Sequence, residues 1–377
     1  MTGAGGPTLD LQIDEAVAGE CPAGSTDRDW VREAMQKIEA DFARSADTHL
    51  IKLDLPCLER AGIDLYLKDE STHPSGSLKH RLARSLFLYG LCNGWIEADK
   101  PVVEASSGST AISEAYFARL IGVPFVAVAP ASTAPEKISA IEFLGGEVRL
   151  VAPTAIYAEA ASVAERTGGH YMDQFTYAER ATDWRGNNNI AESLFTQMQR
   201  ERYPVPRWIV VSAGTGGTSS TIGRFIRYRS PLLGPTRLCV VDPENSVFYD
   251  YFHSGDATLR LDRGSRIEGI GRPRVEASFN PQVIDRMLRI PDASSLAAIR
   301  WLERLLGRKC GGSTGTNLCG ALKLAGDMMA RGAQGSIVTM ICDPGERYLH
   351  TYYDDGWLAE HGLDIAPAMA ALDAFNC

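Results

Sequence analysis

The sequence has no run of 18 apolar residues, so we expect no membrane-spanning helix. Its first residues lack the basic start and the apolar core of a secretory signal, and residues 1–25 are predicted to form a mobile leader. Basic residues are not in excess either, since the formal net charge is -9. This charge argues against a nucleic-acid partner. We therefore expect a soluble cytoplasmic protein.

Paired cysteines are also missing. The eight cysteines are scattered and none of them forms a CxxC motif, which argues against a zinc knuckle and gives no disulfide framework. We predict mostly reduced, partly buried thiols, as in a cytoplasmic protein, and no metal site.

Strand-like and helix-like segments alternate along the 377 residues. Domains usually hold about 100–200 residues, so two domains or one large α/β unit are expected. The alternation predicts parallel sheets flanked by helices, with ligands bound beyond the carboxyl ends of the strands. The predicted strands are Leu65–Lys68, Pro101–Glu104, Phe125–Ala129, Val148–Val151, Trp208–Ser212, Leu238–Asp242 and Ile337–Ile341.

Lys79 is the first candidate for chemistry. It follows a Pro-Ser-Gly-Ser turn and opens a helix with an apolar face. A lysine at a helix start is commonly a solvated surface residue, yet cations favour the opposite end of a helix. The small residues around it would let a flat ligand approach closely. A desolvated lysine has a lowered pKa, so it can act as a nucleophile and form a Schiff base.

A second turn is rich in hydroxyl groups. It consists of Ser106, Ser107, Gly108, Ser109 and Thr110, between a predicted strand and a predicted helix. Backbone N–H groups and hydroxyl donors at the positive end of a helix suit a carboxylate or a phosphate. Ordinary N-capping by one serine or threonine is the alternative. Five small polar residues exceed what one cap requires, so we predict an anion site.

A third turn is rich in glycine and consists of Gly214, Thr215, Gly216, Gly217 and Thr218. Such a turn can hold an anion on its backbone N–H groups, although it is not a Walker loop because GK[ST] is missing. With Asp242 at the end of the next predicted strand, it would also fit a dinucleotide site. A nicotinamide dehydrogenase is therefore an alternative of a different class.

Asp343 ends a fourth strand and is followed by Pro-Gly. The simplest interpretation is a turn former. The functional interpretation is a carboxylate at the mouth of a strand, where it would face the nitrogen of a heterocycle.

In this order, the four turns resemble the cysteine synthase family of fold-type-II pyridoxal-phosphate enzymes, over about residues 48–353. The family's P-S-x-S-x-K turn carries its Schiff-base lysine, which the resemblance places at Lys79. The T-S-G-N-T loop, which binds the substrate carboxylate, corresponds to residues 106–110. The G-T-G-G-T loop, which holds the cofactor phosphate, corresponds to residues 214–218.

Three further motifs support the resemblance. The family's glutamine-phenylalanine pair, whose glutamine helps to bind the substrate carboxylate, matches Gln174 and Phe175. Its G-I-G turn, which lines the closing cleft, begins here at Gly269. Its terminal G-E-R-Y-L matches the residues from Gly345 to Leu349. Each motif alone is weak, but all of them occur in register.

Two positions depart from the family pattern. The asparagine that contacts the phenolic oxygen of the cofactor is replaced by Ser109, and the serine that usually faces the pyridine nitrogen is replaced by Asp343. A carboxylate at that nitrogen would favour the protonated ring, which is a stronger electron sink. This substitution suits a lyase at least as well as a synthase.

The segments EASSGSTAISEAYFARL, DQFTYAERATDWRGNNNIAES and GSRIEGIGRPRVE look closest to the L-cysteine desulfhydrases of this family. This resemblance implies pyridoxal-phosphate-dependent β-elimination on L-cysteine, giving sulfide, pyruvate and ammonia, with Lys79 as general base. The alternative is a β-replacement synthase that makes cysteine, cystathionine or a related β-substituted alanine from an activated serine or cysteine. A non-catalytic member of the fold is a further alternative.

The resemblance also implies a tryptophan synthase β-like fold with two domains, each containing a mainly parallel sheet flanked by helices. We expect residues 84–190 to form the smaller domain. Residues 26–83 and 191–377 would form the larger one, with the cofactor in the cleft between the two. A homodimer that acts on a small amino acid is implied as well.

Overall fold

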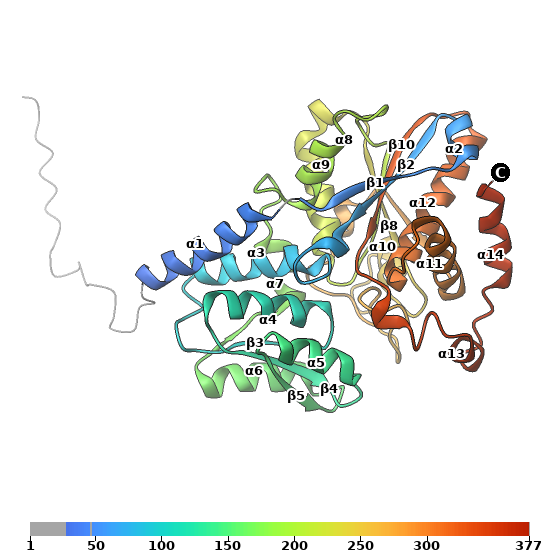
Figure 1. The fold of residues 1–377 in the computed structure, drawn as a ribbon. Helices are drawn as coiled ribbons and strands as arrows, with labels where there is room; N and C mark the ends of the chain where they lie inside the picture. The colour runs from blue at the N-terminus through green and yellow to red at the C-terminus, as the bar shows by residue number, and fades with distance from the viewer. Residues whose placement is uncertain (1–27, 46, 377) are drawn as a thin grey trace, which may run out of the picture.

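The computed structural model describes residues 28–45 and 47–376, so the leader predicted at residues 1–25 lies outside the described part of the chain. Two mainly parallel sheets lie side by side, and each has helices on both faces (Figure 1). This architecture confirms the predicted α/β class. Over the described ranges, no helix is both long and apolar enough to cross a membrane.

The larger sheet has six strands in the order β1-β2-β10-β7-β8-β9. Only β1 runs antiparallel to its neighbour, and all other pairs are parallel. Every residue of β2 and β10 is buried, as expected for strands covered on both faces. The strands are β1 (His49–Leu53), β2 (Ile63–Asp69), β7 (Trp208–Ser212), β8 (Arg237–Asp242), β9 (Arg286–Arg289) and β10 (Gly335–Ile341).

Two apolar clusters hold helices on the two faces of this sheet. One face is covered by α2 (Pro56–Arg60), α11 (Asp292–Leu306), α12 (Gly312–Ala330) and α14 (Ala366–Asp373). The opposite face is covered by α8 (Ile190–Met198), α9 (Gly217–Leu233) and α10 (Phe248–Ser254). The remaining elements are short: α13 (Asp355–Glu360) and the 3₁₀ turns η1 (Glu70–Thr72), η2 (Pro281–Val283), η3 (Glu346–Tyr348) and η4 (Ala374–Asn376).

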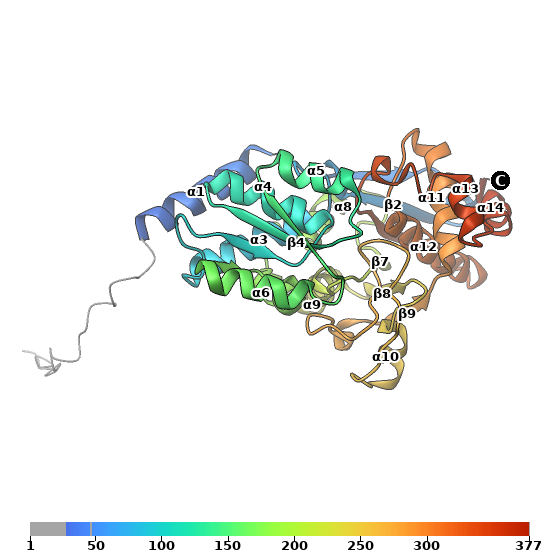
Figure 2. The same cartoon turned by 90° about the horizontal axis from the view of Figure 1, so that it is seen from below.

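The smaller sheet has four parallel strands in the order β5-β4-β3-β6. They are β3 (Val102–Glu104), β4 (Phe125–Pro130), β5 (Glu147–Val151) and β6 (His170–Tyr171). Its helices are α1 (Arg28–Arg44), α3 (Lys79–Cys92), α4 (Ser109–Ile121), α5 (Pro135–Phe143), α6 (Ile156–Thr167) and α7 (Gln174–Ala181). Figure 2 shows α4 and α6 on opposite sides of β4.

The seven predicted strands are all present, with ends that differ by at most two residues from those expected. The structure adds β1, β6 and β9, which the sequence analysis does not predict. It also places α1 differently: Ala34 and Ile38 of this helix are buried with α3 and α4 of the smaller layer, whereas α1 was expected in the larger domain. The boundary expected at residue 84 falls inside α3.

Candidate active site

A cavity of about 430 Å³ lies where the turns after β2, β3, β7 and β10 meet. This is a size typical of small-molecule sites, which usually measure about 300–1,000 Å³. The structure brings all the predicted site residues together in its lining. They are Lys79, Ser106, Ser107, Gly108, Ser109, Thr110, Gln174, Gly214, Thr215, Gly216, Gly217, Thr218, Gly269 and Asp343.

Lys79 is the first residue of α3, so its side chain starts from a rigid element at the cavity wall. Removal from water disfavours the ammonium form and lowers the pKa of Lys79 to about 8. The nearby Arg272 lowers this pKa further, whereas the carboxyl groups of Glu104 and Glu114 oppose the shift. A sizeable fraction of Lys79 is therefore the neutral amine near neutral pH, the form that acts as a nucleophile or base.

The hydroxyl-rich turn runs into the N-terminus of α4, with Gly108 at the cap position. Thr110 donates its hydroxyl to Oε1 of Gln174 at 2.8 Å. This bond occupies the amide oxygen and leaves the amide N–H₂ as the free, donating end of Gln174. The turn and Gln174 together present donors to the cavity, which suits a carboxylate.

Ser109 has a partner from the far end of the chain. Nη1 of Arg347, in η3, donates to the Ser109 hydroxyl oxygen at 2.9 Å. Since the oxygen accepts this bond, the hydroxyl proton remains available for a ligand oxygen. Ser109 can thus donate its hydroxyl proton while it accepts a hydrogen bond from the cationic Arg347. It stands where the cysteine synthase family has asparagine.

The glycine-rich turn is packed so tightly that side chains would not fit. Gly216 has φ +93°, and a Cβ atom there would lie 2.6 Å from backbone atoms of Ser278 and Phe279. A Cβ atom on Gly214 would lie 2.2 Å from the carbonyl oxygen of Gly269. The turn therefore places bare backbone N–H groups at the N-terminus of α9, an arrangement that binds phosphate.

Asp343 is almost fully buried, at 6% exposure, yet only one of its oxygens is bonded. Oδ2 accepts a hydrogen bond from the Tyr348 hydroxyl at 2.7 Å, while Oδ1 has no hydrogen-bond partner within residues 28–45 and 47–376. Burial raises the pKa of Asp343 to about 6, so the carboxylate still predominates at neutral pH. Its unpaired oxygen suits a cationic N–H donor.

These features fit pyridoxal phosphate. Lys79 would offer its amine to the aldehyde, and the turn at residues 214–218 would hold the phosphate. Ser109 would donate to the phenolic oxygen, and the free Oδ1 of Asp343 would accept the pyridinium N–H. Lys79, Ser109, the turn at residues 214–218 and Asp343 all line the same cavity.

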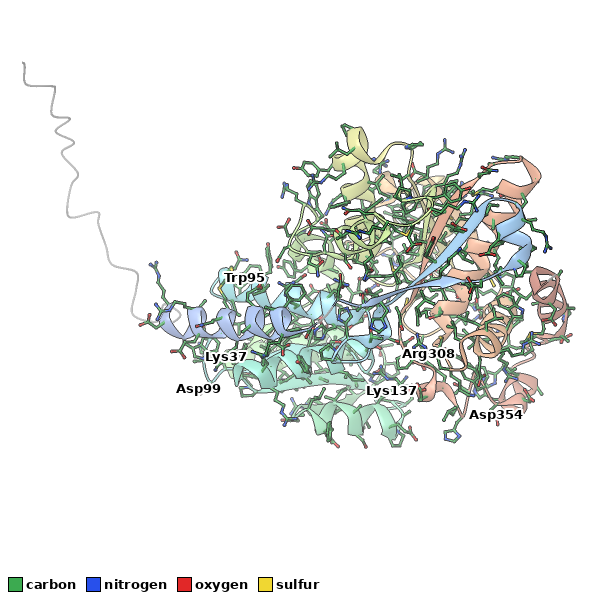
Figure 3. All side chains as sticks on the ribbon, turned by 45° about the horizontal axis from the view of Figure 1, so that its top comes forward. Lys37, Trp95, Asp99, Lys137, Arg308 and Asp354 are labelled. Carbon is green, nitrogen blue, oxygen red and sulfur yellow. The ribbon has the colours of Figure 1, made fainter. Side chains whose placement is uncertain are left out.

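Several lining residues were not singled out in the sequence. Lys137 on α5, labelled in Figure 3, pairs with Glu268 at 2.6 Å and so links the two layers beside the cavity. Arg272 donates to the Tyr157 hydroxyl at 2.7 Å and to Glu276 at 2.8 Å. Its position directly after the G-I-G turn is the one sequence signal that could have identified it.

Asp242, the acid expected in a dinucleotide site, does not line the cavity. Its Oδ2 accepts a hydrogen bond from the backbone N–H of Tyr249 at 2.8 Å, near the start of α10. The dehydrogenase interpretation therefore loses its ribose-binding acid. Among the residues that the structure describes, no cluster of His, Cys, Asp and Glu is arranged to hold a metal ion.

Comparisons with known proteins agree with this geometry. The family described as "Pyridoxal-phosphate dependent enzyme" matches residues 45–343. The chain is 58% identical to the L-cysteine desulfhydrase Cds1 of Mycobacterium tuberculosis (strain ATCC 25177 / H37Ra), over 95% of this chain and 98% of that relative. It is 27% identical to a cysteine synthase of Dictyostelium discoideum, over 82% of each chain.

Among solved structures, the fold is similar to that of O-ureido-L-serine synthase. The TM-score is 0.70 at 24% identity, and the match covers 86% of this chain and 98% of the other. At this identity the likeness shows the fold alone. The family match and the identity to a desulfhydrase of nearly equal span together show that the chain belongs to the family of pyridoxal-phosphate dependent enzymes.

Proposed function

We propose that this chain is an L-cysteine desulfhydrase that uses pyridoxal phosphate to convert L-cysteine and water into sulfide, pyruvate and ammonia. The observation that carries the proposal is the 58% identity, over 95% of the chain, to a protein named as an L-cysteine desulfhydrase. The cavity supports it, because it contains a desolvated lysine, an anion-binding turn and a buried carboxylate.

Binding of the substrate would begin at its carboxylate. The serine hydroxyls of residues 106–110 and the backbone N–H groups of this turn that have no partner among the described residues lie at the positive end of α4, and the free amide N–H₂ of Gln174 adds a further donor. These contacts fix the amino acid with its Cα atom towards Lys79. The rate of the chemical step depends on this orientation, since a misplacement of about 1 Å can cost a factor of about 10².

Proton transfer at Cα is the role we assign to Lys79. With a pKa of about 8, a useful fraction of its Nζ is unprotonated near neutral pH and can remove the α-proton. Bound pyridoxal phosphate supplies the electron sink for the charge that develops at Cα. Asp343, ionised at neutral pH, holds a proton at the ring nitrogen and so keeps the sink strong.

The remaining steps break the Cβ–S bond and release nitrogen. The sulfur leaves with the bonding electron pair and is protonated to hydrogen sulfide, and we assign the delivery of the abstracted proton to Lys79, which lines the cavity. Water then replaces nitrogen on the three-carbon product, so that pyruvate and ammonia are formed. One L-cysteine and one water thus give one sulfide, one pyruvate and one ammonia.

A β-replacement synthase is the second candidate, favoured by the similarity to the Dictyostelium discoideum cysteine synthase. Such an enzyme would break the same bond but add a second nucleophile at Cβ in place of releasing pyruvate. The lower identity, 27% against 58%, makes this candidate the weaker one. Pyruvate release measured with and without an added thiol distinguishes the two.

The test of the proposed chemistry is the replacement Lys79→Ala. We expect the purified wild-type protein to show the visible absorption of a lysine-bound cofactor and to release sulfide from L-cysteine. Lys79→Ala is expected to lose both, while a Lys323→Ala control on the exposed side of α12 keeps both. A Lys79→Ala protein with full turnover would refute the assignment.

The oligomeric state, the cellular compartment and the domain boundaries are also proposals. We propose a soluble, cytoplasmic homodimer with no nucleic-acid or membrane partner. Its smaller domain would comprise residues near 84–190 together with α1 and the start of α3, which pack on the smaller sheet, and the remaining residues would form the larger domain. The acidic net charge of -9 and the family resemblance support it. Light scattering on the purified protein tests the dimer, and limited proteolysis tests the domain boundaries.

A further inference from the structure

Two carboxyl groups that the proposed chemistry does not use are buried behind the cavity. Glu104 ends β3, and Glu114 lies on α4, about one helical turn after the hydroxyl-rich turn. Neither residue has exposed surface. A fully buried glutamate is rare unless it is paired, so two of them side by side require an explanation.

Glu104 is bonded on both of its oxygens. Oε1 accepts the backbone N–H of Ala105 at 2.7 Å, and Oε2 accepts the backbone N–H of Gln174 at 3.1 Å. Ala105 and Gln174 both line the cavity, and Gln174 also receives the hydroxyl of Thr110. Glu104 therefore ties together the two chain segments that would hold the substrate carboxylate.

Glu114 has the opposite environment. Both of its oxygens are buried, and within the described ranges no donor reaches either of them. The charged or titratable groups that face the two glutamates are Lys79 on α3, Tyr171 on β6 and Asp173 before α7. A bare carboxylate in this position would be strongly unfavourable, because it is neither solvated nor hydrogen-bonded.

Proton sharing resolves this difficulty. Burial and the neighbouring Glu104 hold the pKa of Glu114 well above its usual value, and burial raises the pKa of Glu104 to about 7. Two backbone N–H donors favour the ionised form of Glu104, so the proton of the pair belongs on Glu114. As a neutral acid, Glu114 carries one O–H group, which can donate to the neighbouring carboxylate of Glu104.

We propose that Glu114 is a positioning residue that, as a neutral acid, donates to Glu104 and keeps it as the carboxylate that orients Gln174 and Ala105 around the substrate carboxylate. This inference rests on the proposed function for the location of the substrate carboxylate. When the pair loses its proton at higher pH, two negative charges lie behind the anion site. Affinity for an amino-acid carboxylate then falls, and the same two charges also raise the pKa of Lys79.

The test compares wild-type holoenzyme with Glu114→Gln, which keeps a donor but cannot ionise. The matched control is Glu165→Gln, on the exposed side of α6. KM and kcat for L-cysteine are measured between about pH 6 and pH 10. At high pH, KM is expected to rise more steeply in the wild type and in the control than in Glu114→Gln. The difference between the two slopes should be at most about a factor of ten in KM per pH unit. The pKa of Lys79 seen in the kcat–pH profile should be slightly lower in Glu114→Gln than in the wild type, because Glu114 no longer raises it.

A KM–pH profile of Glu114→Gln identical to that of the wild type overturns the proposal. If L-cysteine is not turned over, the same three proteins are titrated with L-alanine and binding is followed in the visible absorption of the cofactor. That arm separates failure of this inference from failure of the proposed function.

A second measurement needs no variant and no turnover. Infrared spectra of wild-type protein with ¹³C-labelled glutamate should show the carbonyl stretch of a neutral carboxylic acid at about pH 7, where exposed glutamates are ionised. The band should disappear as the pH rises. Its absence at neutral pH would overturn the shared proton even if Glu114→Gln fails to fold.

Discussion

Replacing Asp343 by asparagine is expected to stabilise the cofactor-free protein and to weaken cofactor binding. Burial raises the pKa of Asp343 from 3.8 to about 6. Each pH unit between these two values corresponds to about 1.4 kcal/mol, so the ionised carboxylate reduces the free energy of unfolding by about 3 kcal/mol at pH values above about 6. An amide of nearly the same shape carries no charge and removes this penalty.

The gain in stability on replacing Asp343 by asparagine depends on pH. Because the folded-state pKa is raised, the neutral acid is fully present below pH 3.8, and the penalty develops as the pH rises through about 6. Asp343→Asn should therefore gain about 1–3 kcal/mol at about pH 8, since an imperfectly bonded amide offsets part of the gain, and nothing at about pH 4. The Tyr348 hydroxyl can still donate to the amide oxygen.

Two assays measure the two halves of this prediction. Urea unfolding of the cofactor-free proteins at both pH values gives the free energy of unfolding. Titration with pyridoxal phosphate gives the affinity, which should fall about 10- to 100-fold, because a charge-assisted hydrogen bond is worth about 1.5–3 kcal/mol. Asp262→Asn, at an exposed position, is the control for loss of a carboxylate. An Asp343→Asn protein that is less stable than the wild type at pH 8, or that binds the cofactor equally well, would refute the reasoning.

Three further predictions follow from the same structure. Gly216→Ala should lower cofactor affinity at least tenfold, because φ is +93° and the new Cβ atom would lie 2.6 Å from backbone atoms. Gly326→Ala is the control, since it lies in a helix with open space around the new Cβ atom, and its free energy of unfolding in urea should increase by about 1 kcal/mol. Lys137→Met breaks the partly exposed pair with Glu268, so KM should rise no more than about fivefold and its dependence on salt should weaken. The wild-type protein should lose up to about 1.4 kcal/mol of its free energy of unfolding per pH unit, between the usual pKa of glutamate and the raised pKa of Glu114. Glu114→Gln should not show this loss when unfolding is measured across pH.

The strands of the two sheets were predictable because buried parallel strands appear in the sequence as short apolar runs. β10 is the clearest case, since all its residues are buried. The missed strands β1 and β9 lie at the edges of the larger sheet and are partly exposed. Their sequences, HLIKL and RMLR, mix charged and apolar residues, so local pattern alone does not separate them from loops.

The turns of the site were predictable because each is a local segment that follows a strand. What joins them was not predictable. The bond between Arg347 and Ser109 spans 238 residues of sequence. Glu104 and Glu114 look like an ordinary strand end and an ordinary helix residue, and their burial arises only when β3, α4 and α7 pack together.

The central claim, that this chain eliminates sulfide from L-cysteine, is tested most directly by measuring sulfide and pyruvate together as the purified holoenzyme consumes L-cysteine without any second nucleophile. We predict equal amounts of the two products from the first turnovers onward, and neither product with Lys79→Ala. Sulfide without pyruvate, followed by further turnover only when a thiol or amine is added, would contradict the claim and identify a β-replacement synthase.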